Sequence, residues 1–324
     1  MSNAIRIHAN GGPEVLRWED VPVGDPGPGE ARVRHAAIGV NYIDTYHRSG
    51  LYKLALPSGL GSEAAGTVEA VGAGVDWVKP GDRVASCTGP LGAYSESRVI
   101  AADRLVKLPV GISERVAATL MLKGLTVQYL FRQTYKLKAG ETILFHAAAG
   151  GVGLIACQWA RALGVTMIGT VGSDEKAALA KANGCTHTIV LTRENFVERV
   201  KALTGGKGVP VVYDGIGKDT FPASLDCLSP RGLWVSFGNA SGAIAAFDIL
   251  LLSQKGSLYA TRPTLVNHAG TRGSLTAMAD EMFDLVLAKK IVSEPRQTFA
   301  LKDAADAHRA LESRATTGST ILLP

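Results

Sequence analysis

The sequence is poor in cysteine: its 324 residues include four, and no two of them lie closer than 28 residues. There is no C-x-x-C pair and no cluster of cysteine with histidine. Disulfide frameworks and structural zinc sites both depend on closely spaced ligand residues, so this spacing argues against both. The four residues are Cys87, Cys157, Cys185 and Cys227.

Long apolar runs are also missing. No run reaches the roughly 18 residues that a membrane-spanning helix needs. Residues 1–6 have neither the charged start nor the apolar stretch of a signal peptide. We therefore expect a cytoplasmic protein that does not associate with membranes.

Basic residues never form a run of five or six, although the formal net charge is +5. This thin distribution argues against nucleic acid as a partner. The slight positive excess either favours an anionic cofactor or merely reflects composition.

What the chain does have is enough apolar residues, 46%, to build large cores, and a length typical of two domains. Residues 1–122 show short strand patterns separated by glycine and proline turns, which predicts a β-rich domain. The strand patterns include 4–8, 30–38, 65–71 and 82–86.

From about residue 121, helix patterns alternate with apolar strands, which predicts a parallel sheet with right-handed crossovers. The helices and strands expected after residue 263 either extend this sheet or return to the first domain. Expected helices are 125–135, 154–163, 174–183, 194–203, 219–228, 275–288 and 302–313. Expected strands are 142–145, 165–171, 188–191, 209–213, 233–237, 297–301 and 319–323, with 256–261 as an edge strand.

Small residues follow the strand at 142–145 in the order Ala148-x-Gly150-x-x-Gly153. Such a turn exposes backbone N–H groups at the start of a helix, where a pyrophosphate binds. The spacing is one residue off the commonest glycine fingerprint and also fits an ordinary tight turn. Glycines after three more strands, at Gly172, Gly215 and Gly238, favour a dinucleotide site.

The residues that follow the expected strand at 165–171, the second strand of the parallel sheet, indicate which cofactor binds. NAD enzymes usually place an acidic residue about 20 positions beyond the glycine turn, where this chain has Ser173. Ser173 and Lys176 suit a 2′-phosphate, which favours NADP over NAD. The alternative is that Ser173 only caps the following helix, with Asp174 and Glu175 at its positive end.

A polar segment from Asn41 to Tyr46, continued by Tyr52, follows the strand at 30–38. Loops after strands commonly carry function, and a tyrosine can stack on a ring and donate to a carbonyl. The alternative is a set of partly buried tyrosines at a domain edge.

Seven histidines occur, and only His146 adjoins the glycine turn. It is either a general base or a spacer at the end of the strand. We find no Ser/His/Asp arrangement that the sequence can place together, and no set of metal ligands.

In these features the chain resembles the medium-chain dehydrogenase/reductase superfamily, and within it the zinc-free quinone oxidoreductases, which include ζ-crystallin. It is most similar to the bacterial NADPH:quinone reductases. The resemblance covers the whole chain. Its motifs are residues 11–16, 41–46, 59–66, 80–84, 123–126, 146–153 and 236–239.

This resemblance implies an α/β fold with two domains. A GroES-like, β-rich catalytic domain would comprise residues 1–122 and 263–324. A Rossmann doubly wound, NADP-binding domain would comprise residues 123–262. Cofactor and substrate would lie in the cleft between them, and the chain would form a homodimer through the edge strand at 256–261.

The resemblance also implies chemistry without a metal. Zinc alcohol dehydrogenases carry Gly-His-Glu where this chain has Gly61-Ser62-Glu63, and a cysteine in the loop that here reads Gly39-Val40-Asn41. Without a Lewis acid, alcohol oxidation is not expected. Hydride transfer from NADPH to a small quinone requires mainly orientation and a proton.

Carried over position by position, the resemblance implies catalytic or substrate-side roles for Asn41, Tyr46 and Tyr52. A tyrosine that helps to bind the 2′-phosphate in the relatives is replaced by Thr192, which leaves Lys176 and Arg193 for that contact. The expected cofactor contacts are Asn41, Tyr46, Gln128, Gly150, Gly151, Val152, Gly172, Ser173, Lys176, Ile216, Phe237, Gly238, Asn239, Ser241 and Arg314.

Two alternatives stay open. One is reduction of the C=C bond of an enone or alkenal, because an α,β-unsaturated carbonyl is a similar electrophile. The other is an RNA-binding or structural role, as in some relatives of ζ-crystallin, against which the thin spread of basic residues argues.

Overall fold

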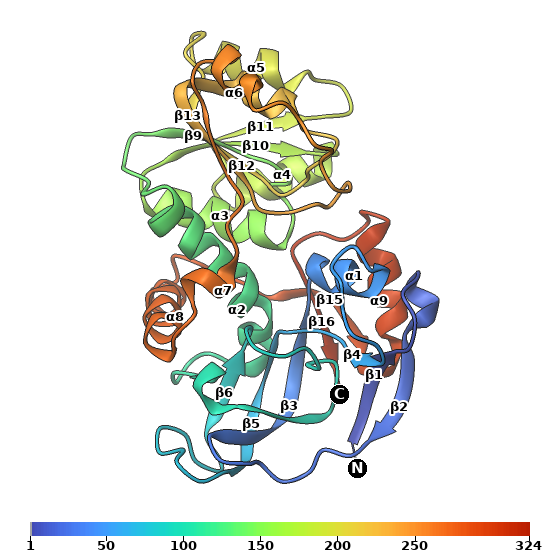
Figure 1. The fold of residues 1–324 in the computed structure, drawn as a ribbon. Coiled ribbons are helices and arrows are strands. Elements are labelled where there is room, and N and C mark those ends of the chain that lie inside the picture. Colours follow the sequence, from blue (N-terminus) through green and yellow to red (C-terminus); the bar gives the residue numbers. More distant parts are fainter. Residues whose placement is uncertain (1) are drawn as a thin grey trace. The chain divides into compact units, whose positions relative to one another are not determined.

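A computed structural model describes residues 2–324 of the chain and divides them into two compact units. Unit 1 comprises the chain up to Leu125 together with Ala269–Lys289 and Ser293–Pro324. Unit 2 comprises Thr126–His268 and Lys290–Val292. Figure 1 shows the elements of each unit.

Unit 2 is built on a six-stranded sheet in the order β11-β10-β9-β12-β13-β14, in which every neighbouring pair is parallel. From β9, the chain first adds β10 and β11 on one side. It then returns to the other side of β9 and adds β12, β13 and β14, so the direction of strand addition reverses between β9 and β12. Ligands bind at such a switch point in doubly wound folds. The strands are β9 (Thr142–Phe145), β10 (Thr166–Val171), β11 (His187–Val190), β12 (Val209–Asp214), β13 (Leu228–Ser236) and β14 (Tyr259–Thr261).

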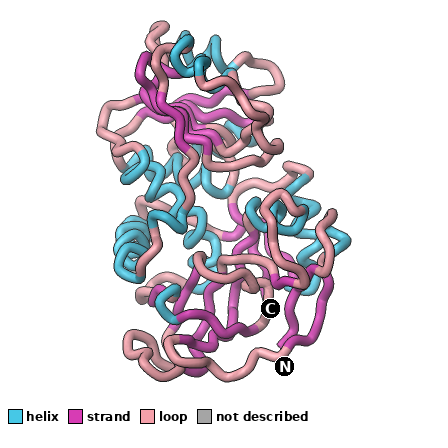
Figure 2. The backbone as a smooth tube through the Cα atoms, viewed as in Figure 1, coloured by secondary structure: helices cyan, strands magenta, loops and turns pink. Residues whose placement is uncertain are grey.

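Helices flank this sheet on both sides, as Figure 2 shows for the strands in magenta and the helices in cyan. The helix that follows the glycine turn is buried on all sides over residues 153–160, including Leu154, Ile155 and Trp159. This burial explains why the periodic pattern forms a helix here. These helices are α3 (Gly151–Ala162), α4 (Asp174–Ala182), α5 (Phe196–Leu203) and α6 (Leu250–Gln254), and the short α7 (Leu265–His268) follows the last strand of the sheet.

Two expected helices differ from the structure. The helix predicted at 219–228 is only a 3-10 turn at Ala223–Cys227, because Pro222 lacks an N–H and disfavours a helical conformation of Phe221. The helix predicted at 125–135 begins earlier, as α2 (Glu114–Tyr129), and continues as a π-helix at Leu130–Thr134. Its first turns are rich in Ala, Leu and Met, which are strong helix formers.

Unit 1 contains a seven-stranded sheet, β15-β16-β3-β5-β6-β8 with β7 also paired to β3, and a three-stranded sheet, β2-β1-β4. The closing strand β16 lies antiparallel to β3, so the end of the chain returns to the sheet of the first segment. The strands are β1 (Ser2–Ile7), β2 (Arg17–Val21), β3 (Glu30–Val40), β4 (Ser58–Gly59), β5 (Ala64–Val71), β6 (Arg83–Ser86), β7 (Ser97–Ala101), β8 (Val106–Lys107), β15 (Pro295–Ala300) and β16 (Ser319–Leu323). The helices are α1 (Tyr42–Ser49), α8 (Arg272–Leu287) and α9 (Ala304–Glu312).

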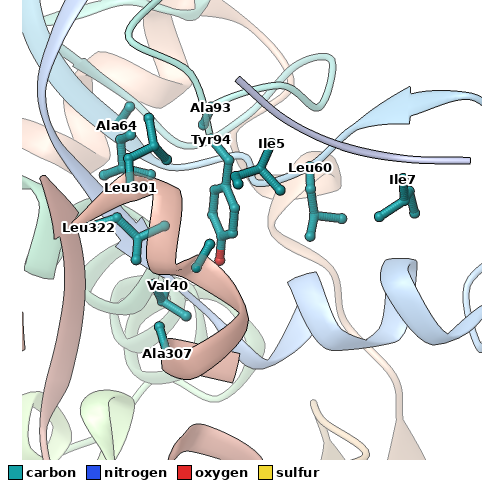
Figure 3. Packing of buried hydrophobic residues seen from close by; sticks show 12 residues of the cluster. Ile5, Ile7, Val40, Leu60, Ala64, Ala93, Tyr94, Leu301, Ala307 and Leu322 are labelled. Carbon is teal, nitrogen blue, oxygen red and sulfur yellow. The ribbon is translucent and has the colours of Figure 1, made fainter. Parts of the chain in front are cut away.

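A core of unit 1 joins the first and the last segments of the chain. Ile5 and Ile7 of β1 pack in one cluster with Ala307 of α9 and Leu322 of β16. Figure 3 shows the ring of Tyr94 among these side chains, with its hydroxyl pointing away from Ala93. Within residues 2–324, every helix is too short or too polar to cross a membrane.

Candidate active site

The glycine turn follows β9 at the switch point of the unit 2 sheet. His146 N donates to Tyr213 O at 3.0 Å, and Ala148 N donates to Thr170 O at 3.0 Å, so the turn is bonded to both neighbouring strands. Helix α3 then starts behind Gly150, which has an extended backbone and supplies no side-chain cap. The N–H groups of the first turn therefore remain available for an anion.

The third glycine of the turn is needed for close packing. A Cβ on Gly153 would lie 2.3 Å from Ala147 O and 2.6 Å from both the carbonyl carbon and the oxygen of Ala148. These atoms belong to the backbone of the turn itself and cannot rotate away. Glycine at this position thus allows the helix to start directly against the end of the strand.

His146 is a buried strand-end residue and faces no open space, since it is 1% exposed. Its Nδ1 lies 2.9 Å from Thr170 Oγ1, and its Nε2 lies 3.0 Å from Ser224 Oγ. Burial lowers its pKa and outweighs the opposing effect of Asp214. This geometry favours a structural role over that of a general base.

The structure brings together a serine, a histidine and an aspartate that the sequence alone could not place together. Ser224 donates to Asp214 Oδ2 at 2.9 Å and also contacts His146. Here the hydroxyl lies between carboxylate and imidazole, whereas a catalytic triad has the imidazole in the middle. All three side chains are at most 1% exposed, so the serine is no nucleophile.

Asp214, at the end of β12, organises the loop that follows it. Its carboxylate accepts from Ile216 N at 3.0 Å and Gly217 N at 3.1 Å. It also accepts from Thr220 Oγ1 at 2.8 and 2.9 Å, and from Trp234 Nε1 at 3.3 Å. A fully buried carboxylate with this many donors needs no further partner, and it holds Ile216 in one position.

The loop after β13 is bonded to the loop after β12. Ser241 N donates to Ile216 O at 2.8 Å, and Ser241 Oγ donates to the same oxygen at 2.9 Å. Gly238 permits close approach, because a Cβ there would lie 2.5 Å from Gly215 O. Phe237 contacts Phe145 with a centroid distance of 5.7 Å. Asn239 lies on the same loop, so these candidates are gathered at one edge of the sheet.

At the end of β10, Ser173 is the N-cap of α4, and its Oγ accepts from Lys176 N at 3.3 Å. The capping interpretation of Ser173 is therefore confirmed, and it does not conflict with cofactor binding. A Cβ on Gly172 would meet nothing within 4 Å, so the space beside it is open. Arg193 forms an ion pair of 2.6 Å with Asp174. Gln128 lies on α2, where its Oε1 accepts from Gln133 Nε2 at 2.7 Å.

The segment from Asn41 to Tyr46 was expected to be a loop, and it is instead the N-cap and the first turns of α1. Asn41 N donates to Asp44 Oδ2 at 2.9 Å, which is half of a capping box. The Asn-x-x-Asp spacing was the signal for this helix. Tyr46 is 8% exposed, and its ring lies 5.3 Å from that of Tyr52.

Arg314 follows α9 in unit 1, with its N donating to Leu311 O at 3.2 Å. Tyr42 Oη donates to the same carbonyl at 3.2 Å, which brings the start of α1 and the end of α9 together. Burial raises the pKa of Tyr42, and the charge of Arg314 opposes this. Asn41, Tyr46, Tyr52 and Arg314 thus belong to unit 1, whereas the other candidates belong to unit 2.

A chain of buried polar groups behind α1 was not predicted. Arg48 pairs with Glu312 at 2.6 Å and also lies 3.0 Å from His308 Nδ1. His308 Nε2 lies 3.1 Å from Tyr94 Oη, which donates to Asp44 Oδ2 at 2.9 Å. Because Arg48 can only donate, His308 must carry its proton on Nε2, and the donors from Arg48 through His308 and Tyr94 lead to Asp44.

Asp44 is fully buried, and its Oδ1 has no hydrogen-bond partner among residues 2–324. Burial raises its pKa to about 7 despite the donors Asn41 and Tyr94. Across the same residues, no three side chains of the types His, Cys, Asp and Glu are grouped so that they could hold a metal ion.

Comparison with known proteins agrees with these two units. Residues 27–110 match the family model described as "Alcohol dehydrogenase GroES-like domain", and residues 151–286 match "Zinc-binding dehydrogenase". A quinone oxidoreductase of Pseudomonas aeruginosa is 61% identical over 325 residues, which is 100% of both chains. A 2-haloacrylate reductase of Burkholderia is 47% identical over 331 residues, covering 100% of this chain and 99% of its own.

The solved structure of Escherichia coli quinone oxidoreductase complexed with NADPH is similar in both sequence and fold. It covers 99% of this chain and 100% of its own, with 53% identity and a TM-score of 0.98. The predicted α/β fold with a GroES-like and a Rossmann part is confirmed. The chain belongs to the zinc-free quinone oxidoreductases of the medium-chain dehydrogenase/reductase superfamily.

Proposed function

We propose that this chain is an NADPH-dependent quinone reductase that transfers a hydride to small quinones without a metal. The observation that carries this conclusion is the uncapped start of α3 behind the glycine turn, at the switch point of the sheet. The similarity to the Escherichia coli enzyme complexed with NADPH supports the same cofactor here. We assign residues 123–262 to the NADP-binding domain, and residues 1–122 and 263–324 to the GroES-like catalytic domain.

The residues of unit 2 fit NADPH. The free N–H groups of Gly151 and Val152 would bind the pyrophosphate, since α3 has no side-chain cap. The open space beside Gly172 would take the adenosine ribose, with Ser173 and Lys176 next to it. When bound, NADPH supplies the hydride. The remaining proposed contacts are Gln128, Gly150, Ile216, Phe237, Gly238, Asn239 and Ser241 in unit 2, and Asn41, Tyr46 and Arg314 in unit 1.

In unit 1, the proposed substrate-side residues are Asn41, Tyr46 and Tyr52. Tyr46 and Tyr52 form an edge-to-face pair with an interplanar angle of 63°. Aromatic faces of this kind orient a flat ring such as a quinone. Orientation is the main requirement, because the quinone is already a good hydride acceptor.

Stopped-flow spectroscopy tests the function. NADPH absorbance is followed after mixing the protein with 1,4-benzoquinone, 1,4-naphthoquinone and 2-alkenals at one pH. We expect rapid oxidation with the quinones. No oxidation with any quinone would contradict the proposal.

A second candidate function is reduction of a C=C bond conjugated to a carbonyl. It is favoured by the 47% identity to a protein named 2-haloacrylate reductase. The stopped-flow comparison distinguishes the two, because a C=C reductase would oxidise NADPH faster with 2-alkenals or 2-haloacrylate than with quinones.

Lys176→Ala should weaken NADPH binding by about tenfold to a hundredfold and leave NADH binding almost unchanged. The reason is that an ammonium–phosphate hydrogen bond is worth about 1.5 to 3 kcal/mol. Fluorescence titration with both cofactors measures the effect. Lys181→Ala, at the exposed far end of α4, is the matched control. Equal losses for NADPH and NADH would show that Lys176 does not contact the 2′-phosphate.

We further propose a cytoplasmic homodimer that draws on the cellular NADPH pool. Strand β14 is the edge of the unit 2 sheet, and its Tyr259 is 62% exposed. An exposed edge strand with an aromatic side chain is suited to pairing with a second copy. Sedimentation equilibrium of the wild type and of Tyr259→Lys would test this arrangement.

A further inference from the structure

A buried ion pair in unit 1 has no role in the function described so far. Glu63 lies just before β5 and is fully buried. Its Oε1 accepts from Leu122 N at 2.8 Å, and its Oε2 accepts from Asn41 Nδ2 at 2.7 Å. Lys123 Nζ lies 3.2 Å from the same Oε2. The carboxylate is thus held by the N-cap of α1 and by α2, with donors to both oxygens.

Lys123, in contrast, is incompletely bonded. Its side chain is 7% exposed, and an ammonium has three N–H donors. Among residues 2–324, Glu63 is the single acceptor, and 3.2 Å is longer than the usual ammonium–carboxylate distance of about 2.7 to 2.9 Å. Two N–H donors are therefore left in a site where water has little access. A buried donor without a partner is costly, so an incoming oxygen atom would be bound strongly.

The surroundings of Lys123 keep this cation positioned. Glu63 and Asp44 are the acidic groups that face it, and the charges of both interact with each other and with Lys123. Asn41 shares Oε2 of Glu63 with Lys123, so the amide and the ammonium lie side by side. Asn41 is also one of the proposed substrate-side residues.

We propose that Lys123 is a catalytic residue that binds the carbonyl oxygen of the acceptor and donates the proton to it, with Glu63 as a positioning residue. This inference rests on the proposed function. Hydride addition brings two electrons to the quinone and oxidises NADPH to NADP⁺. The quinone becomes a hydroquinone monoanion, whose oxygen forms an O–H bond as one N–H bond of Lys123 breaks. The neutral amine then takes a proton from solvent.

The same residue would serve an enone, because hydride addition to its C=C bond also places the negative charge on a carbonyl oxygen. A proton donor at Lys123 is therefore suited to hydride acceptors that are conjugated carbonyl compounds. A donor aimed at the developing oxyanion accelerates such a step more than it binds the neutral substrate.

The test uses Lys123→Met, which keeps the unbranched side chain up to the position of Cε and removes its donors. We expect kcat with 2,6-dimethyl-1,4-benzoquinone to fall by about 100-fold, as for the loss of a general acid. With tetrachloro-1,4-benzoquinone, whose product anion is stable without a proton, the loss should be under tenfold. Binding of NADPH, measured by fluorescence titration, should change less than twofold. Lys302→Met, at an exposed position of unit 1, is the control and should behave like the wild type.

Lys123→Met leaves the Glu63 carboxylate buried without its cation, which destabilises a fold. The double variant Glu63→Gln/Lys123→Met removes that charge. Its amide oxygen keeps the acceptor for Leu122 N, and its Nε2 can donate to the Asn41 side-chain oxygen once the Asn41 amide is rotated by 180°. It should show the same dependence on the quinone, with a melting temperature near that of the wild type. Equal losses with both quinones, or a kcat within threefold of the wild type, would overturn the role of Lys123. Absence of turnover in the wild type would instead overturn the proposed function.

Discussion

Gly153→Ala is expected to destabilise the protein by about 3 kcal/mol, the upper range for overpacking of a tight site, and to weaken NADPH binding at least tenfold. The new methyl group would lie 2.3 Å from Ala147 O, far inside van der Waals contact. Relief requires the start of α3 to move away from the end of β9. That movement displaces the N–H groups that would bind the pyrophosphate. Urea denaturation and fluorescence titration with NADPH measure the two effects.

The matched control is Gly273→Ala. Gly273 also lies in the first turn of a helix, α8, and a Cβ there would have only Thr271 Oγ1 within 4 Å, at 3.9 Å. Alanine in a helix is more favourable than glycine by about 0.5 to 1 kcal/mol, so this variant should be equally or slightly more stable. If Gly153→Ala matched this control in both assays, the close packing of the turn would not matter for the site.

Asp44→Asn should change the pH dependence of stability more than any other carboxylate replacement in unit 1. Burial raises the pKa of Asp44 from 3.8 to about 7. The folded state therefore binds a proton that the unfolded state has released, and the free energy of unfolding falls as pH rises from about 4 to 7. A pKa rise of this size corresponds to about 4 kcal/mol. Asparagine keeps an oxygen for Asn41 and Tyr94 and carries no charge, so this fall should disappear.

Urea denaturation of wild type and Asp44→Asn between pH 4 and pH 8 tests the prediction. The stability of the variant relative to the wild type should increase across the range and level off above pH 7. Asp280→Asn, at an exposed position of α8, should give a curve parallel to the wild type. Parallel curves for Asp44→Asn would mean that the buried carboxyl does not change its protonation in this range.

Most of the sheet of unit 2 was predictable, because its strands are short apolar runs bounded by turn residues and the crossovers through α3, α4 and α5 are periodic helices. The strand predicted at 319–323 has the observed bounds of β16. The two helices that were predicted wrongly, at 219–228 and 125–135, have local causes. Pro222 interrupts a segment with helical periodicity, and the first turns of α2 are so evenly apolar that no single face stands out.

By itself, the sequence determined the family, the alternation that builds the sheet of unit 2, and the glycine turn at the end of β9, since these depend on residues adjacent in the chain. Tertiary structure alone decided which side chains act on each other. His146 reaches Ser224 across 78 residues, and Lys123 reaches Glu63 across 60. Spacing along the chain carries no signal for such pairs, because burial and close packing of separate elements bring them together.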